Sequence, residues 1–163
     1  MVENIILIGM PNSGKSTLGK ILAERLEMSF IDTDQLIKDK TKKNLRDIVN
    51  EDGLEKFLEI QENVLLNLKL NGFVISTGGS VICGDAGMRH LKKNGKVIFL
   101  NIPFEEVEKR SLEGRRFARA EGQSVREMYD ERQPLYEKYA DIEIECGNFS
   151  IDDLVSEIIG SFK

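Results

Sequence analysis

The glycine-rich segment Gly9–Ser16 leaves few folds open to this chain. It reads Gly-Met-Pro-Asn-Ser-Gly-Lys-Ser and fits G-x-x-x-x-G-K-[S/T], the pattern of a phosphate-binding loop. The apolar run Asn4–Gly9 before it has the length of a buried strand. The segment Lys15–Leu26 after it carries leucine and isoleucine along one helical face. Strand, loop and helix in this order favour a phosphate site over a glycine turn that only caps a helix.

The spacing within this loop has a physical reason. Glycine lets the backbone curl until several N–H groups point at phosphate oxygens, and the following helix adds the positive end of its dipole. Lys15 is then placed to reach the β- and γ-phosphates of a nucleotide, and the Ser16 hydroxyl to ligate Mg²⁺. We therefore expect ATP to be bound by Gly9, Asn12, Ser13, Gly14, Lys15, Ser16 and Thr17.

Apolar runs of strand length alternate with amphipathic helical segments along the chain. After the first strand these runs lie at 30–32, 73–76, 96–101 and 142–145. Buried strands separated by helices predict an α/β fold with a parallel sheet, which binds ligands at the carboxyl ends of its strands. At roughly 150 residues per domain, residues 1–163 form one domain. Pro134 predicts a bend or break in the helix that begins near Ser124.

The net charge and the cysteine content limit which binding partners and which cellular compartment we expect. The formal net charge of −5 argues against nucleic acid or an anionic membrane as a partner. No apolar run approaches the roughly 18 residues that a membrane span needs, and the chain does not begin with a basic leader. Cys83 and Cys146 are far apart, which suits reduced thiols. We expect a cytoplasmic monomer that acts on a small molecule.

Two further motifs follow the second and third predicted strands. In Asp32-Thr33-Asp34, the two carboxylates are expected to point the same way from an extended segment, one serving Mg²⁺ and the other an attacking hydroxyl. The alternative is an acidic helix N-terminus, which the helix dipole favours. The paired glycines of Thr77-Gly78-Gly79-Ser80 allow a ligand close to the backbone, and the alternative there is a simple turn.

Arginines gather in the last third of the chain. Arg110 comes before the basic segment 114–122, which we interpret as a lid that closes over the nucleotide, the alternative being a solvated loop. Arg132, within Glu131-Arg-Gln-Pro-Leu-Tyr136, has the fork geometry to bind a substrate carboxylate.

These motifs, in this order and spacing, resemble those of the shikimate kinases, small relatives of the nucleoside monophosphate kinases. The resemblance runs from Ile5 to about Ile159. It implies a three-layer α/β/α P-loop fold on a five-stranded parallel sheet, with a substrate-binding helical region at about 33–62 and a lid at about 112–122. It assigns Asp32 to Mg²⁺, Asp34 to the acceptor hydroxyl, Gly78, Gly79 and Ser80 to the substrate ring, Arg132 to its carboxylate, Arg110 to adenine and Arg116 to the lid.

The resemblance implies ATP-dependent phosphorylation of a hydroxyl, converting shikimate to shikimate 3-phosphate in aromatic amino-acid biosynthesis. Lys15 and Arg116 would stabilise the transferring group, and Asp34 would position the acceptor. Three departures stand on the acceptor side: Leu58 where the family has arginine, Ser80 where it has a third glycine, and Arg115-Arg116-Phe117 in the lid.

Three alternatives remain open. One is a sibling kinase for another small polyol or hydroxy acid. Another is a nucleoside monophosphate kinase, although residues 33–72 hold only Arg46 where such enzymes need several arginines. The third is a non-catalytic nucleotide-binding module. If Leu58→Arg leaves the use of shikimate unchanged, another cation has taken the place of the family's arginine, and Arg46, Lys42 and Lys43 are the candidates.

Overall fold

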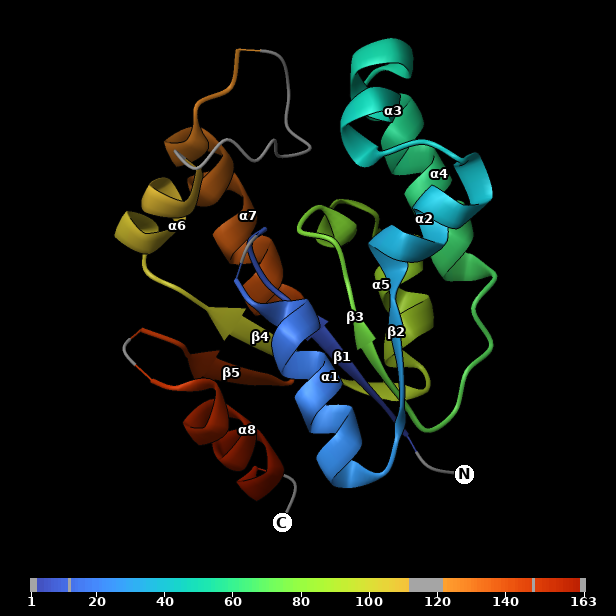
Figure 1. Cartoon of the computed structure of the whole chain (residues 1–163). Coiled ribbons are helices and arrows are strands. Elements are labelled where there is room, and N and C mark those ends of the chain that lie inside the picture. Colours follow the sequence, from blue (N-terminus) through green and yellow to red (C-terminus); the bar gives the residue numbers. More distant parts are fainter. Residues whose placement is uncertain (1–2, 12, 112–121, 148, 162–163) are drawn as a thin grey trace.

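Strands and helices alternate from one end of the chain to the other (Figure 1). The computed structural model describes residues 3–11, 13–111, 122–147 and 149–161. Its elements are β1 (Asn4–Ile8), α1 (Lys15–Leu26), β2 (Ser29–Asp32), α2 (Thr33–Thr41), α3 (Leu45–Asp52), α4 (Leu54–Leu66), β3 (Phe73–Ser76), a 3-10 helix (Val81–Cys83), α5 (Asp85–Lys92), β4 (Gly95–Asn101), α6 (Phe104–Ser111), α7 (Val125–Tyr139), β5 (Ile142–Glu145) and α8 (Ile151–Gly160).

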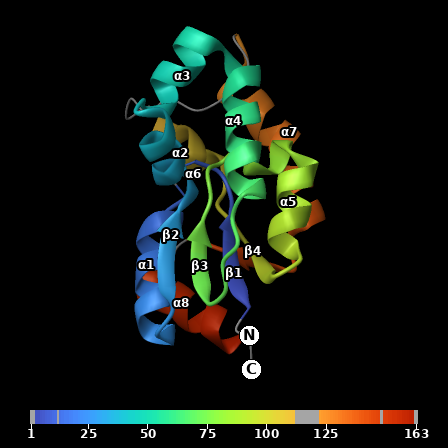
Figure 2. The ribbon, with the colours of Figure 1, turned by 90° about the vertical axis from the view of Figure 1, so that its right-hand side faces the viewer.

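The five strands form one parallel sheet in the order β2-β3-β1-β4-β5. The central strand β1 is buried along its whole length because helices cover both faces of the sheet. Figure 2 shows α1 and α8 on one face and α5 and α7 on the other. The predicted three-layer α/β/α architecture with a five-stranded parallel sheet is confirmed over the described residues.

The helices between β2 and β3 have a small core of their own. Helices α2, α3 and α4 rise beyond the carboxyl ends of the strands (Figures 1 and 2). They enclose an apolar cluster of Ile37, Ile48, Phe57 and Val64, separate from the main core around the sheet. These helices therefore form a projecting unit beside the end of the sheet where ligands of α/β folds bind.

Pro134 does not break α7, so the predicted break is wrong. The helix is continuous over Val125–Tyr139 with the proline inside it. Met128, Arg132 and Tyr136 recur every four residues and are all buried against the body of the protein. This packing outweighs the roughly 3 kcal/mol that an internal proline costs a helix.

The start of α7 agrees with the predicted helix that begins near Ser124. Helix α7 begins with a capping box, in which Ser124 accepts from the Glu127 N–H and the Glu127 carboxylate accepts from the Ser124 N–H. Both cysteines are free thiols, Cys83 exposed and Cys146 buried. Within the described ranges, we find no helix with the length and apolarity to cross a membrane.

Candidate active site

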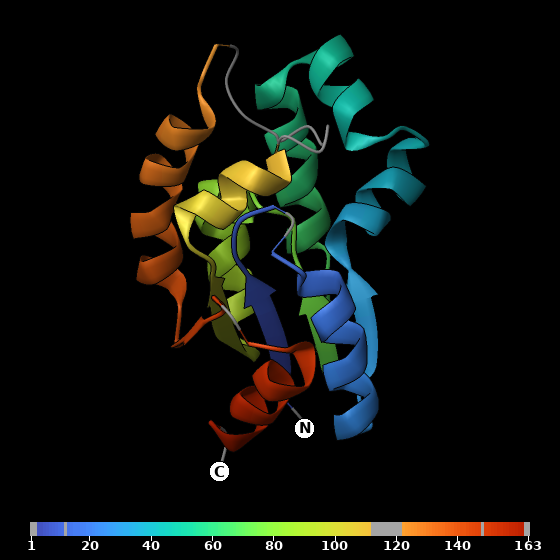
Figure 3. The same ribbon diagram turned by 60° about the vertical axis from the view of Figure 1, so that its left-hand side comes forward.

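The phosphate loop arches from the carboxyl end of β1 into α1 (Figure 3). Gly9 has φ 152°, and a Cβ at this position would lie 2.7 Å from the Leu100 carbonyl oxygen of the neighbouring strand β4. Gly14 has φ 87° and is the N-cap of α1. Both glycines are thus needed for the backbone path rather than for their small size alone.

Lys15 is buried at the centre of this loop, with 6% of its surface exposed. Its Nζ donates to the Gly9 carbonyl at 2.8 Å, to the Met10 carbonyl at 2.9 Å and to Ser13 Oγ at 3.3 Å. Burial lowers the pKa of Lys15 to about 8, while the carboxylates of Asp34 and Asp32 oppose that shift. The two carboxylates therefore face the same space as the ammonium group.

Ser16 and Asp32 are joined directly across the site. The Ser16 hydroxyl donates to Asp32 Oδ2 at 2.6 Å. Ser76 Oγ lies 3.2 Å from Ser16 Oγ, and Ser76 is the donor because the Ser16 proton already points to Asp32. Ser16 lies in the first turn of α1, after the loop that follows β1, whereas Asp32 and Ser76 end β2 and β3. The three side chains meet at the carboxyl edge of the sheet.

The two aspartates do not share an extended segment, so that part of the prediction is wrong. Asp32 ends β2 and caps α2, its Oδ1 accepting from the Asp34 N–H at 2.9 Å. Asp34 already lies in the first turn of that helix. The alternative interpretation, an acidic helix N-terminus, is therefore correct as well, since one carboxylate oxygen caps the helix and the other holds Ser16.

Asp34 is a buried carboxyl group. Its Oδ1 is enclosed and has no hydrogen-bond partner among the residues that the structure describes. Burial, aided by the negative charge of Asp32, raises the pKa of Asp34 to about 6, although Lys15 pulls it down. A buried carboxylate that keeps a free lone pair is suited to accept a hydrogen bond from a ligand hydroxyl.

The paired glycines after β3 fit between two parts of the site. A Cβ on Gly78 would collide with Asp34 Oδ1, and one on Gly79 would lie 2.5 Å from Cδ of Pro11 in the phosphate loop. The Gly78 N–H donates to Thr33 Oγ1 at 3.3 Å, which ties this loop to α2. The groups that lie close to these glycines are thus the Asp34 carboxyl group and the phosphate loop. The approach of a ligand to the same backbone stays a prediction.

Ser80 is buried and faces helix α4. Its hydroxyl donates to Oε1 of Gln61 on α4 at 3.3 Å, and both residues are almost fully buried. The hydroxyl in place of a third glycine thus fastens the glycine loop to the projecting helices. Sequence reasoning did not single out Gln61, although a glutamine on the apolar stripe of a helix is a sign of a buried polar contact.

Arg132 lies on the inner face of α7 with 5% of its surface exposed. Its positive charge lowers the pKa of Lys15, which places the guanidinium in the same electrostatic field as the phosphate loop. Tyr136 follows one turn further along α7, and its hydroxyl donates to the Gly79 carbonyl at 2.5 Å. The charge of Arg132 opposes the rise in the pKa of Tyr136 that burial causes. The sequence motif predicts no role for Tyr136.

The remaining predicted nucleotide residues are only partly described. Arg110, at the end of α6, forms an ion pair with Glu106, with Nε 3.0 Å from the carboxylate. Asn12 and the predicted lid residues Arg115, Arg116 and Phe117 lie outside the described residues. Their assignments stay predictions.

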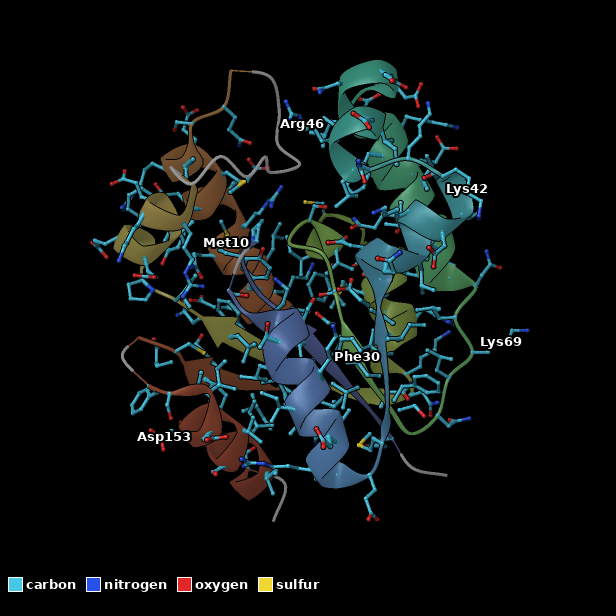
Figure 4. The ribbon with its side chains drawn as sticks, in the orientation of Figure 1. Met10, Phe30, Lys42, Arg46, Lys69 and Asp153 are labelled. Carbon is cyan, nitrogen blue, oxygen red and sulfur yellow. The ribbon has the colours of Figure 1, made fainter. Side chains whose placement is uncertain are left out.

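Leu58 packs against the small core of the projecting helices. Of the three nearby cations, Lys43 is bound to Glu51 at 2.8 Å. Figure 4 shows Arg46 on the side of α3 that faces α7, whereas Lys42 lies on the far side. Arg46 is exposed and is therefore the cation best placed to reach a ligand between α3 and α7.

Together these residues form a polar site at the carboxyl end of the sheet. The charged groups of Lys15, Arg132, Asp32 and Asp34 converge there. The phosphate loop and the glycine loop after β3 bring backbone groups close to them. The oxygens of Ser16 and Asp32 are hard ligands of the kind that Mg²⁺ prefers. No group of three or more His, Cys, Asp or Glu that could hold a metal ion is found in the described part of the chain.

Comparison with known proteins gives a consistent family. A family model described as "Shikimate kinase" matches residues 11–163. A shikimate kinase of Persephonella marina is 34% identical over 165 residues, covering 99% of this chain and 100% of that protein. Threonine synthase-like 1 of Mus musculus is 34% identical over 171 residues, covering 99% of this chain but 22% of that protein. The solved shikimate kinase of Acinetobacter baumannii, in complex with shikimate, matches with a TM-score of 0.90 and 30% identity, covering 99% of this chain and 93% of that one.

Proposed function

The chain belongs to the shikimate kinase family, and from that premise we propose that it transfers the γ-phosphoryl group of ATP to the 3-hydroxyl of shikimate. The observation that carries the proposal is the convergence of Lys15, Asp34 and Arg132. Lys15 offers a cation to the phosphates, Asp34 a carboxylate to the hydroxyl, and Arg132 a cation to the carboxylate of shikimate. A small hydroxy acid matches this set of groups at both of its ends.

The transfer is an in-line displacement. The acceptor hydroxyl oxygen attacks the γ-phosphorus while its proton passes to a carboxylate oxygen of Asp34. The bond between the γ-phosphorus and the β–γ bridging oxygen breaks, and ADP leaves with that electron pair. Lys15 stabilises the charge that develops on the phosphoryl oxygens, because its ammonium already lies inside the phosphate loop. In this step the protein accelerates the reaction by positioning the reactants and by stabilising charge.

We include Mg²⁺ in this proposal because the donor set fits it. The Ser16 hydroxyl and the Asp32 carboxylate are adjacent oxygen ligands, and Mg²⁺ in such sites takes one or two protein oxygens together with nucleotide phosphates. When bound, the ion would neutralise charge on the β- and γ-phosphates. Asp32 is held in place for this role by its bonds to the first turn of α2.

For the nucleotide and lid residues the proposal rests on the sequence motifs. We assign Arg110 to the adenine side and Arg116 to the transferring phosphoryl group. Substituting Arg116 by alanine is expected to lower kcat and leave the KM for shikimate within about two-fold, since an arginine of this kind acts on transition-state charge.

The direct test is product formation. Purified protein is incubated with ATP, Mg²⁺ and shikimate, and the products are identified by mass spectrometry and phosphorus NMR. The proposal expects ADP and shikimate 3-phosphate in equal amounts, with formation lost in Asp34→Asn. ADP release that does not depend on shikimate would overturn it.

A second candidate is a kinase for a different small polyol or hydroxy acid. Leu58 favours it, since it stands where the family resemblance implies an arginine, and its side chain packs against the small apolar core. The same assay with a panel of hydroxylated acids and neutral polyols separates the two. A neutral polyol with a higher kcat/KM than shikimate would establish this second candidate.

A further inference from the structure

The hydroxyl of Tyr136 joins the two sides of the acceptor site. It lies at the centre of the protein, with 0% of the residue exposed, and donates to the Gly79 carbonyl oxygen at 2.5 Å. Arg132 lies one turn earlier on the same buried face of α7. A carbonyl oxygen can only accept, so the direction of the bond from Tyr136 to Gly79 is fixed. The helix that carries Arg132 is therefore fastened to the glycine loop through Tyr136.

Gly79 is in turn closely confined. Its missing side chain leaves just enough room for Pro11 of the phosphate loop, and the adjacent Gly78 packs against the carboxyl group of Asp34. A shift of the Gly79 carbonyl is therefore transmitted to the surroundings of Asp34 and of the phosphate loop. The ring of Tyr136 is itself held in a stack on Phe99 of β4, with ring centroids 5.0 Å apart.

We propose that Tyr136 is a positioning residue that fixes the distance between Arg132, which binds the acceptor carboxylate, and Asp34, which receives the acceptor hydroxyl. This inference rests on the function proposed above and adds a determinant of acceptor specificity to it. Tyr136 selects acceptors whose anionic group and reacting hydroxyl are separated by that distance, and it does so without touching the acceptor.

The hydroxyl keeps its proton throughout. Burial raises the pKa of Tyr136 far above neutrality, and the nearby charge of Arg132 opposes this only in part. The bond to Gly79 is therefore present over the whole range of pH in which the enzyme works. Without the hydroxyl, α7 would lose its bond to the glycine loop, and the position of Arg132 relative to Asp34 would be less well fixed.

The test compares Tyr136→Phe with Tyr129→Phe in the full chain. Tyr129 is the matched control, since it lies on the same helix and its hydroxyl bonds to the Ile102 carbonyl at 3.4 Å, away from the acceptor groups. Each protein is assayed with shikimate and with shikimate methyl ester, which lacks the negative charge. Circular dichroism and thermal midpoints verify folding.

Tyr136→Phe is expected to raise the KM for shikimate roughly ten-fold, because a buried hydrogen bond that sets the position of Arg132 is lost, with a smaller change in kcat. The KM for ATP should stay within about two-fold, because the phosphate loop retains its own contacts. The preference for shikimate over its ester should shrink at least about five-fold in this variant, and Tyr129→Phe should retain it. An unchanged preference, or an equal loss for both acceptors through kcat alone, would overturn the proposal.

Two controls keep the outcome interpretable. Failure of the wild-type protein to phosphorylate shikimate would refute the proposed function, whereas normal wild-type turnover with unchanged discrimination in the variant would refute only the role of Tyr136. If Tyr136→Phe does not fold, 3-fluorotyrosine at this position keeps the ring and perturbs the bond from the hydroxyl to the Gly79 carbonyl. The discrimination should then change, and no change would reject the proposal.

Discussion

One carboxylate, that of Asp32, holds the phosphate-loop serine and caps the helix of the acceptor side at the same time. Its Oδ2 accepts from Ser16 at 2.6 Å, and its Oδ1 accepts from the Asp34 N–H at 2.9 Å. The nucleotide side and the acceptor side therefore share a single rigid group. This arrangement lets the two roles of Asp32 be separated by substitution, because asparagine caps helices about as well as aspartate does.

Asp32→Asn and Asp32→Ala should differ in a defined way. Both remove the charge and should raise the Mg²⁺ concentration for half-maximal activity roughly ten-fold or more. Only the alanine variant also loses the cap, at a cost of about 1 kcal/mol in the free energy of unfolding. Activity titrations with Mg²⁺ and urea unfolding measure the two effects. Ser150→Ala, which removes the cap of α8, should lower stability and leave the Mg²⁺ requirement unchanged; equal Mg²⁺ titrations for all variants would contradict the assignment.

The pH dependence of kcat/KM should be set by two groups, one that must be deprotonated and one that must be protonated. The pKa of Asp34 is raised to about 6, so as pH falls through that value the carboxylate becomes protonated and can no longer receive the acceptor proton. The pKa of Lys15 is lowered to about 8, so as pH rises through that value the cation for the phosphates is lost. The kcat/KM for shikimate should fall on the acid side, and the kcat/KM for ATP on the alkaline side. An acceptor profile that is flat down to pH 5 would rule out Asp34 as the base.

Gly78→Ala tests the close contact with Asp34. The added Cβ collides with the Asp34 carboxyl group, so this group must shift. A displacement of about 1 Å at the acceptor hydroxyl costs on the order of a hundred-fold in rate. Gly160→Ala is the control, since its Cβ meets nothing within 4 Å and an alanine near a helix end costs nothing in propensity. Steady-state rates measure both variants, and an active Gly78→Ala enzyme would show that the Asp34 position is not critical.

Leu58→Arg tests whether a cation is missing from the acceptor site. Since we assign shikimate as the acceptor and Arg46 lies on the side facing α7, the added arginine should change the KM for shikimate less than about three-fold. It should cost about 1–2 kcal/mol in stability, because Leu58 packs on the small apolar core. Arg46→Ala should raise that KM roughly ten-fold. A sharp gain in Leu58→Arg, with no effect of Arg46→Ala, would favour an acceptor without a carboxylate at this position.

Local sequence patterns predicted much of the fold because they act over short distances. The apolar run before Gly9, the helical face after Lys15 and the capping residues Ser124 and Ser150 specify their elements almost alone. Pro134 shows where such reasoning fails. Its local cost is real, and the buried face of α7 against the rest of the protein outweighs it.

The candidate site was predicted in part for the same reason. Lys15, Ser16 and Asp32 lie in motifs whose spacing reflects their contact with a common ligand. Gln61 and Tyr136 act through contacts 19 and 57 residues away along the chain, with Ser80 and Gly79 respectively. A sequence pattern alone does not contain such pairings, because they depend on how helices α4 and α7 pack around the glycine loop.

Phosphorylation of shikimate by this chain is tested most directly by kcat/KM for shikimate against a panel of small hydroxy acids and polyols in an ADP-release assay. We expect shikimate to be the best acceptor by at least about ten-fold, the product to be the 3-phosphate, and Asp34→Asn to abolish the turnover. No shikimate-dependent ADP, or a better acceptor in the panel, would contradict it.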